Sequence, residues 1–446
     1  MVSCLRQRVA VLSPLFAAMA VSFHAGTAHS AGYGVHENSA SYLGTAFAGK
    51  ASNPQDASIA ANNPAGIAYV EGTQISVGSA VIFKGGEFEG KHTAPNLLGP
   101  SETVVAEGKT KDFQSQTWVP FGHFVFPLNE QISLGLSGYS PDGIQLDYDE
   151  DWAGRYFAKK TSVKTINLQG TVSYKFQEDL SIAFGLIGSY VKGELTQKTD
   201  LTNFMAPNYP AAEAKIDGDA KTLGWTIGTL WRVNESTNLG LAYFSQLDFK
   251  LDGDVKVDGI YPVTKEPVHL KSKGKLDITM PEKATLSLTH QLNDQWTLMA
   301  DATWTRWSRF KEFYVEADAP TLSSYVPINW KDVWAWSLGA SWQVVPEWKL
   351  RIGYMFDQSP VDDENRTART PDSDRDWFTF GANWKPDPSF SIDVSYAYVN
   401  LKKGKIDENK HYTPPNQGGV ITDYGVLTGE YNNSSHILAA QLNYIF

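Results

Sequence analysis

The stretch WTLMADATWT, residues 296–305, alternates between apolar and polar side chains with a period of two residues. Successive side chains of a β-strand point to opposite faces, so this stretch predicts a strand with one apolar face. The apolar face carries Trp296, Leu298, Ala300, Ala302 and Trp304. The other face carries Thr297, Asp301, Thr303 and Thr305, with Met299 as an exception. Tryptophans end the apolar face, as is typical of strands that cross a membrane.

The same alternation recurs along the chain. Residues 180–186 and 350–357 repeat it, and residues 166–176 set a strongly polar face against an apolar one. That polar face is too hydrophilic for the core of a soluble sandwich, although a half-exposed strand of a soluble sheet has a similar pattern. Aromatic residues make up 13% of the chain and charged residues 20%, a combination that favours a membrane barrel with aromatic girdles and a wet lumen.

Counting these stretches predicts an all-β fold, a transmembrane antiparallel β-barrel of 14 strands over residues 73–446. Short and long connectors alternate, which is the sidedness of an outer-membrane barrel. The long connectors, residues 85–110, 199–221, 253–265 and 404–433, are expected to face outside, with both termini in the periplasm. Strands are expected at about residues 73–84, 111–126, 131–148, 162–176, 180–198, 214–233, 237–252, 266–291, 295–316, 330–345, 348–359, 374–385, 389–403 and 434–446.

Residues 1–30 have the features of a secretory signal peptide. Two arginines precede an apolar run, and small residues precede position 31. Removing the leader takes away 30 of 446 residues, the one cysteine, Cys4, and two positive charges, so 416 residues remain and the net charge falls from −11 to −13. No disulfide is then expected, and the acidic balance argues against nucleic acid as a partner.

Residues 31–72 lack the alternation and are rich in Ala, Gly, Asn and Ser. A segment so irregular and so poor in large side chains needs other parts of the chain to cover it. We expect it to lie inside the barrel lumen as a plug, or hatch.

Several short motifs resemble the long-chain fatty acid transporters of Gram-negative outer membranes, whose relatives carry monoaromatic hydrocarbons. The motifs are AGY at 31–33, SYLG at 41–44, NPA at 63–65, MPE at 280–282, WTRWS at 304–308, AWSLGASW at 335–342, FDQSPV at 356–361, NRT at 365–367 and PDSDR at 371–375. The resemblance spans the chain after residue 30. It implies a 14-stranded barrel with an N-terminal hatch, and passive uptake of a hydrophobic compound across the outer membrane without a cofactor.

The resemblance places two groups of residues beside the ligand. Proline fixes its own φ and restricts the residue before it, so Asn63, Pro64 and Ala65 are expected to form a rigid turn of the hatch. Tyr33 maps to an apolar family position beside the ligand tail. The alternatives are an ordinary loop turn for Asn63–Pro64 and simple packing against the wall for Tyr33.

The third predicted strand contains a break signal. Gly138, Ser140, Pro141, Asp142 and Gly143 interrupt two alternating stretches, and proline cannot donate to a sheet ladder. A kink is therefore expected, and in the family a kink here opens a lateral gap through which ligand leaves. The alternative is a strand that ends early.

The lumen-facing cations are candidate partners for a fatty acid carboxylate. By strand parity Arg309, Lys331 and Arg375 point inward, together with Asp301 and Arg351, while Arg306 points outward. The family's basic partners map near Gln197 or Lys198 and near Val326, so this chain departs from the family there. Lys198 remains a candidate. The candidate set is Lys198, Arg309, Lys331 and Arg375.

The sequence gives little support for a metal site or for an enzyme. The Asp372, Asp374 and Asp376 group has arginines among its carboxylates and is expected to form ion pairs rather than a metal site. No HExxH, GxSxG or P-loop motif is present, so an enzyme is not expected.

The main hypothesis is outer-membrane uptake of long-chain fatty acids. Outer-membrane lipid and lipopolysaccharide are expected to surround the barrel. The C-terminal aromatic, Phe446, is expected to serve as a signal for the barrel assembly machinery. Alternatives are uptake of aromatic or alkane hydrocarbons, a barrel phospholipase or protease, and a general porin.

Overall fold

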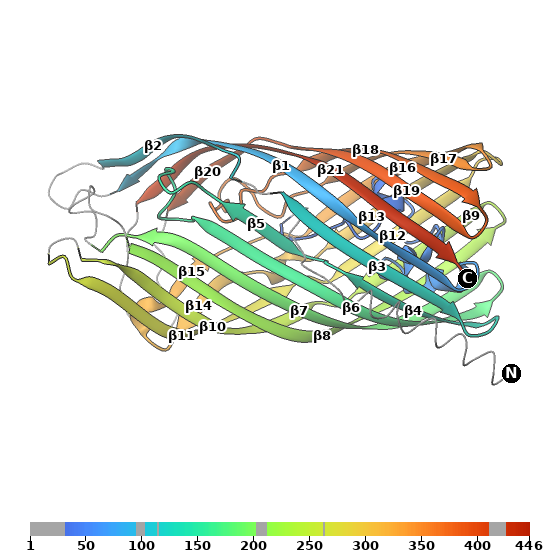
Figure 1. The fold of residues 1–446 in the computed structure, drawn as a ribbon, viewed down its shortest axis with the longest axis horizontal. Coiled ribbons are helices and arrows are strands. Elements are labelled where there is room, and N and C mark those ends of the chain that lie inside the picture. Colours follow the sequence, from blue (N-terminus) through green and yellow to red (C-terminus); the bar gives the residue numbers. More distant parts are fainter. Residues whose placement is uncertain (1–31, 95–102, 114–115, 202–211, 262–263, 410–424) are drawn as a thin grey trace.

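The computed structural model describes residues 32–94, 103–113, 116–201, 212–261, 264–409 and 425–446, which form one closed antiparallel β-barrel (Figure 1). The first strand pairs with the last, from Gln74↔Ile445 to Thr93↔Val426, and this pairing closes the barrel. The predicted signal peptide and residue 31 lie outside the described residues. None of the helices in the described ranges is long and apolar enough to cross a membrane.

The wall consists of 21 strand segments that form fourteen barrel strands. Seven barrel strands are single segments, and seven are two consecutive segments, namely β2 with β3, β4 with β5, β9 with β10, β11 with β12, β13 with β14, β15 with β16, and β19 with β20. The predicted strand number is confirmed. The segments are β1 (Gln74–Ala94), β2 (Thr103–Lys111), β3 (Thr117–Pro127), β4 (Ile132–Tyr139), β5 (Gly143–Asp147), β6 (Lys160–Gln177), β7 (Leu180–Thr199), β8 (Ala212–Asn234), β9 (Thr237–Phe244), β10 (Leu247–Ile260), β11 (Pro267–Met280), β12 (Lys283–Gln291), β13 (Trp296–Thr305), β14 (Glu312–Ala317), β15 (Ser324–Pro327), β16 (Val333–Val345), β17 (Trp348–Asp357), β18 (Arg375–Asp387), β19 (Phe390–Leu401), β20 (Gly404–Asn409) and β21 (Val426–Ile445).

The two faces of the wall follow the predicted alternation. On β13, Leu298 is 43% exposed on the outer face, while Asp301 is 5% exposed on the lumen face. Aromatic pairs stand at the end of the barrel with the short turns, where the rings of Trp296 and Trp342 stack with centroids 5.6 Å apart. The outer surface is therefore an apolar belt with an aromatic border, as a lipid environment requires.

Four of the predicted long loops are shorter than expected. β1 continues to Ala94 and β10 to Ile260, and β8 and β21 begin earlier than predicted, at Ala212 and Val426. In the extension of β1 the outward face is polar, and cross-strand pairs such as Lys109–Glu89, 2.7 Å apart, replace apolar contacts there, while the inward face of the extensions keeps buried side chains such as Phe88 and Leu427. Counting apolar alternation missed them because strand pairing continues beyond the apolar belt.

Three predicted continuous strands are interrupted in the structure. Residues 266–291 divide at Pro281, residues 237–252 divide at 245–246, and residues 295–316 divide at a short 3-10 helix, η3 (Trp307–Arg309). Proline cannot donate to the ladder, which accounts for the first break. The breaks do not interrupt barrel closure.

The N-terminal segment, residues 32–72, lies inside the barrel (Figure 1, dark blue). It has a short helix, α2 (Ala40–Leu43), and two 3-10 helices, η1 (Ala57–Ala61) and η2 (Pro64–Tyr69). Nearly all of its side chains are buried, and they pack against lumen-facing residues of the wall. Small residues on both sides permit the close approach: a Cβ on Gly240 of β9 would collide with the carbonyl oxygen of Ala51.

We expect Gly240→Val to loosen the N-terminal segment from the wall, because overpacking of this kind costs about 1–3 kcal/mol. Tryptic cleavage after Lys50, followed by mass spectrometry, should accelerate about tenfold. Gly170→Val is the matched control, since a Cβ there meets nothing within 4 Å. Equal cleavage of both variants would contradict the packing described.

Candidate functional site: a lumen cavity beside the broken third strand

The third barrel strand is broken at the predicted place. β4 ends at Tyr139 and β5 begins at Gly143. β4 pairs with both neighbours, and its last partner on β3 is Gly122, opposite Gly138. β5 pairs with β6, and in the described residues no pairing joins it to β3. Because β5 resumes pairing with β6, the strand has not simply ended early, and the ladder between β3 and β5 is open.

The start of the N-terminal segment supplies backbone partners to the break. The amide of Val35 donates to the carbonyl of Pro141 at 2.8 Å, and the amide of Gly143 donates to the carbonyl of Tyr33 at 2.6 Å. These two bonds flank the antiparallel bridge between Gly34 and Asp142. The segment thus forms a short β-bridge with the broken strand from inside the lumen.

Asn63 holds the middle of the segment together. Its extended backbone precedes η2, and its side-chain oxygen accepts from the amide of Ala65 at 3.0 Å, which caps that helix. Its amide group donates to the carbonyls of Ala51, at 2.7 Å, and of Thr229 on β8, at 3.0 Å. The hydroxyl of Ser181 donates to the carbonyl of Ala65 at 2.9 Å. The expected turn at Asn63–Pro64 is present, and its bonds run to the wall.

A cavity with an empty volume of about 1050 Å³, part of it open to solvent, lies between the N-terminal segment and the wall. Three groups of residues line it. The segment contributes Val35, His36, Asn38, Phe47, Lys50, Ala61 and Asn62; the broken strand contributes Tyr139, Pro141 and Asp142; the other walls contribute Leu247, Met280, Lys283, Thr303, Trp307 and Asp357, among others. The cavity therefore touches both the segment and the break. Asn63, Pro64 and Ala65 are not among the described residues that line it.

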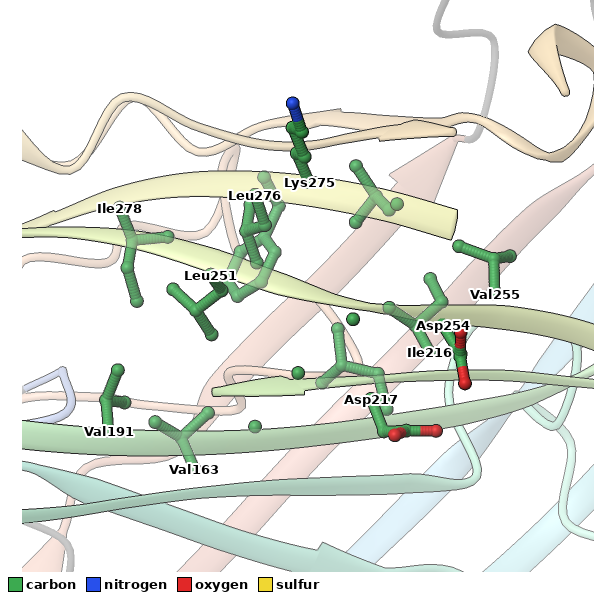
Figure 2. A pocket seen from close by; sticks show the side chains of 17 residues that line it. Val163, Val191, Ile216, Asp217, Leu251, Asp254, Val255, Lys275, Leu276 and Ile278 are labelled. Carbon is green, nitrogen blue, oxygen red and sulfur yellow. The ribbon is translucent and has the colours of Figure 1, made fainter. Parts of the chain in front are cut away.

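A more apolar cavity, with an empty volume of about 500 Å³, lies between β6, β7, β8, β10, β11 and β14. Figure 2 shows Val163, Val191 and Leu251 pointing toward one another into this space. Its lining is mostly Val, Leu, Ile and Gly, with few charged side chains. Such a lining suits a hydrocarbon chain.

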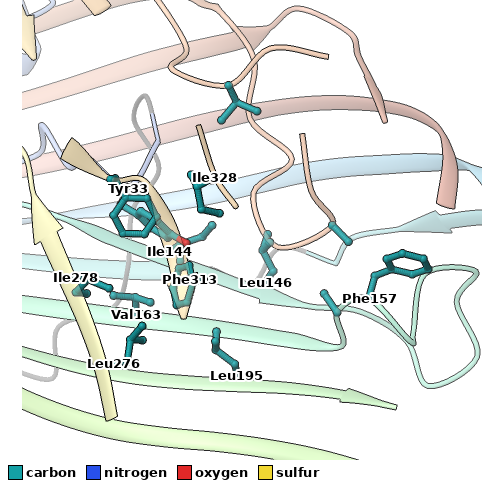
Figure 3. Close-up of a cluster of buried hydrophobic side chains, with 14 of the residues drawn as sticks. Tyr33, Ile144, Leu146, Phe157, Val163, Leu195, Leu276, Ile278, Phe313 and Ile328 are labelled. Atoms are coloured by element: carbon teal, nitrogen blue, oxygen red, sulfur yellow. The ribbon is translucent and has the colours of Figure 1, made fainter. Parts of the chain in front are cut away.

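Tyr33 lines neither of these two cavities but borders a smaller space that shares Leu195, Ile216, Phe313 and Val315 with the apolar cavity. It is 1% exposed, and its ring contacts those of Phe310 and Trp330 with centroids 5.5 and 5.4 Å apart. In Figure 3 it lies among the buried side chains of Ile144, Phe313 and Ile328. The aromatic group around Tyr33 borders apolar space on one side, and its backbone holds the broken strand on the other.

The sequence matches the family described as "Outer membrane protein transport protein (OMPP1/FadL/TodX)" over residues 21–446. The chain belongs to this family. It is therefore an outer-membrane protein of a family that transports hydrophobic compounds, and the family relatives are transporters or channels rather than enzymes.

Relatives of this FadL-family chain cover most of its length. It is 27% identical to outer membrane protein P1 of Haemophilus influenzae, over 96% of this chain and 98% of that protein. It is 26% identical to the long-chain fatty acid transport protein of Escherichia coli, over 88% and 92%. The crystal structure of a FadL homologue from Pseudomonas aeruginosa superposes with a TM-score of 0.81 at 25% identity, covering 93% and 100%. The toluene transporter TodX of Pseudomonas putida, at 16% identity and a TM-score of 0.65 over 94% and 100%, shares the fold.

Two of the candidate carboxylate partners do not point into the lumen. Arg309 follows β13 within η3, where the two-residue period is lost, and its side chain is 40% exposed. It binds Glu282 together with Arg306, which does point outward as predicted. Lys331 lies exposed in the turn before β16. The inward orientation predicted for Arg309 and Lys331 is therefore wrong.

The other inward assignments are correct. Arg351 binds Asp393 at 2.6 Å, Asp301 accepts from the amide of Gly49 at 2.6 Å, and Arg375 is 1% exposed and bound to Asp372. These groups already have protein partners. They hold the lumen together.

Lys198 is occupied by carboxylates. Its ammonium lies 2.8 Å from Glu150 and 3.6 Å from Glu213. Nearby, the amide oxygen of Gln197 accepts from the guanidinium of Arg369 at 2.8 Å. Arg369 belongs to the connection after β17 and, with Val326, borders the space beside Tyr33. Arg369 therefore brings a cation close to Gln197 and Val326, near which the basic carboxylate partners of the family map.

The alternation of strand faces could not identify Arg369 as a lumen cation, because that residue is not on a strand. Its guanidinium also donates to the carbonyls of Lys160 and Thr196 and to the hydroxyl of Thr161. Both terminal nitrogens are thus engaged.

The acidic group at 372–376 forms bonds with protein groups, as expected. Asp372 binds Arg375, Asp374 lies 3.3 Å from the ammonium of Lys402, and Asp376 accepts from the hydroxyl of Tyr354 at 2.6 Å. In the described part of the chain, no three His, Cys, Asp or Glu side chains are grouped to hold a metal.

The charged groups that do face the large cavity were not predicted. The ammonium of Lys283 lies 3.3 Å from a carboxylate oxygen of Asp142, and the imidazole of His36 lies 3.8 Å from Asp357. Lys50 is the only Lys or Arg between residues 31 and 72. This was the one feature of the sequence that could have singled out Lys50 as a candidate. Burial lowers the pKa of Lys50, and the positive charge of Lys283 lowers it further. The negative charges of Asp301 and Asp357 act in the opposite direction and raise it.

We expect Asn63→Ala to loosen the segment around η2, because it leaves two buried carbonyls and one amide without their partner, at about 1–3 kcal/mol. Amide hydrogen exchange over residues 57–69 should accelerate at least about fivefold. Asn129→Ala, which removes a similar side-chain acceptor from an exposed turn, is the control. Unchanged exchange in Asn63→Ala would show that these bonds do not hold the segment.

Proposed function

We propose that this protein takes up long-chain fatty acids by passive diffusion. The acyl chain enters the apolar cavity, moves to the large cavity beside the N-terminal segment, and leaves sideways where β3 and β5 are unpaired. The observation that carries the proposal is the position of the large cavity, which is lined both by the segment and by Tyr139, Pro141 and Asp142 of the break. Membership in a family of hydrophobic-compound transporters supports it.

Burial of the acyl chain supplies the affinity. About fifteen methylenes release roughly 12 kcal/mol gross at ~0.8 kcal/mol each, whereas a solvated ion pair contributes at most about 1 kcal/mol. Uptake down a concentration gradient then needs no cofactor or energy source. The relatives with the higher sequence identity include long-chain fatty acid transport proteins, which favours a fatty acid over the hydrocarbons named for structures that share the fold.

The N-terminal segment is proposed to act as the hatch. Two backbone hydrogen bonds join its first residues to the break, and each is worth about 1 kcal/mol net. Shifting Gly34 and Val35 while Tyr33 stays among its aromatic partners therefore disrupts few hydrogen bonds, whereas the bonds of Asn63 and the close contacts with the wall hold the rest in place. Movement limited to the first residues would join the cavity to the open ladder.

The cargo is tested by growth of a strain that lacks the gene on oleate as sole carbon source. We expect the wild-type gene to restore growth, and Gly143→Val to restore much less, because a branched side chain is placed in the break. Growth on acetate controls for viability. Equal growth on oleate with and without the gene would refute fatty acid uptake, and gene-dependent growth on toluene or an alkane alone would assign the hydrocarbon class.

Hatch movement is tested with a disulfide between Gly34→Cys and Asp142→Cys. These residues form a non-hydrogen-bonded antiparallel pair, whose Cα separation of about 4.5 Å suits a disulfide. We expect oleate uptake by the oxidised double variant to fall at least about tenfold and to recover with reductant. Each single variant, with and without reductant, controls for the substitutions themselves. Uptake at the wild-type rate with the disulfide formed would exclude movement at this bridge.

A further inference from the structure

We propose that Lys50 and Lys283 form a binding station for the carboxylate head of the cargo, in the large cavity directly beside the third-strand break. This inference rests on the proposed function and deepens it, because it names the two cations that would bind the carboxylate of the fatty acid. The station is distinct from the apolar cavity between β6, β7, β8, β10, β11 and β14, whose lining is mostly apolar.

Lys50 is a cation without a bound anion. It follows Gly49, whose positive φ of 83° and hydrogen bond to Asp301 fix the backbone at this point. The side chain lines the cavity and is only partly exposed. Among the described residues its ammonium has no hydrogen bond or ion pair, although Asp301 and Asp357 influence its charge from a distance. A partly buried ammonium in this state gains strongly from an anionic ligand.

Lys283 adds a second cation to the lining, from the barrel wall. It is the first residue of β12, and its ammonium lies 3.3 Å from Asp142, which is 3% exposed. Asp142 belongs to the break and pairs with Gly34 of the N-terminal segment. A ligand carboxylate beside Lys50 therefore competes with Asp142 for Lys283, at the point where the segment meets the broken strand.

The charged side chains that line the cavity are balanced in number, Lys50 and Lys283 against Asp142 and Asp357, but they are not all paired with one another. The lining anions are Asp142, beside Lys283, and Asp357, which lies near both His36 and Arg375. Lys50 remains. A neutral hydrocarbon in this cavity offers no partner to Lys50, whereas a carboxylate neutralises it.

The remaining lining suits the carbon chain attached to such a head. Asn38, Asn62 and Thr303 offer polar atoms, while Val35, Phe47, Ile187, Leu247 and Met280 offer apolar surface. A polar end and an apolar body in one cavity match an amphiphile better than a pure hydrocarbon.

The test measures uptake of radiolabelled oleate and of oleyl alcohol, its uncharged analogue, by cells that express the full-length protein. Lys50→Met is the main variant, because it removes the charge, while Asp301 keeps its hydrogen bonds from the amide of Gly49 and the hydroxyl of Ser287. We expect oleate uptake at limiting concentration to fall about tenfold, the range of one charge-assisted hydrogen bond, with oleyl alcohol uptake unchanged. Lys50→Arg should retain most oleate uptake, and Lys283→Gln, which keeps a hydrogen-bond donor beside Asp142, should lower oleate uptake more than oleyl alcohol uptake.

Lys349→Met is the matched control, since it removes a partly buried lysine of β17 that does not line the cavity. Wild-type oleate uptake by Lys50→Met would overturn the station and leave the proposed function intact. Equal loss of oleate and oleyl alcohol would also overturn it, since it would show a structural role for Lys50. Absence of gene-dependent oleate uptake in the wild type would instead refute the proposed function.

Discussion

The rest of the structure depends on one constraint: backbone polar groups that face lipid must be hydrogen-bonded within the protein. The pairing of β1 with β21, from Gln74↔Ile445 to Thr93↔Val426, removes the free edges of the sheet and meets this constraint for the wall as a whole. A break in any strand works against it. The opening between β3 and β5 is therefore costly unless other groups take up the unpaired backbone.

The N-terminal segment reduces that cost from inside. Tyr33 and Val35 exchange backbone hydrogen bonds with Gly143 and Pro141, so the stretch that lacks β3 as a partner is paired with the segment instead. Proline at position 141 lowers the need further, because it has no amide hydrogen to satisfy. The same contacts that stabilise the break also place the beginning of the segment beside it, which links the strand break to the contents of the lumen.

The sequence alone predicted those parts of the fold that lipid and backbone geometry dictate. Alternation found fourteen strands because the outer face must be apolar, and Pro141 marked the break because it cannot join a ladder. The extension of β1 to Ala94, whose outward face is polar, carried no such signal, and η3 reversed the parity expected for Arg309. Lys50, Lys283 and Arg369 were missed because their roles arise from contacts between segments far apart in the chain, which a single sequence without homologues does not specify.

The distribution of charge inside the barrel separates affinity from selectivity. Apolar burial is similar for a fatty acid and for a hydrocarbon of equal length, so it cannot discriminate between them. Cations that already have full sets of protein partners, such as Arg351 and Arg369, discriminate little as well. Discrimination requires a cation whose partner must come from the ligand, and Lys50 meets that requirement beside the break. A carboxylate that binds beside Lys50 also draws Lys283 away from Asp142. Asp142 belongs to the contact between the N-terminal segment and the broken strand. The charge that selects the cargo would therefore also weaken that contact.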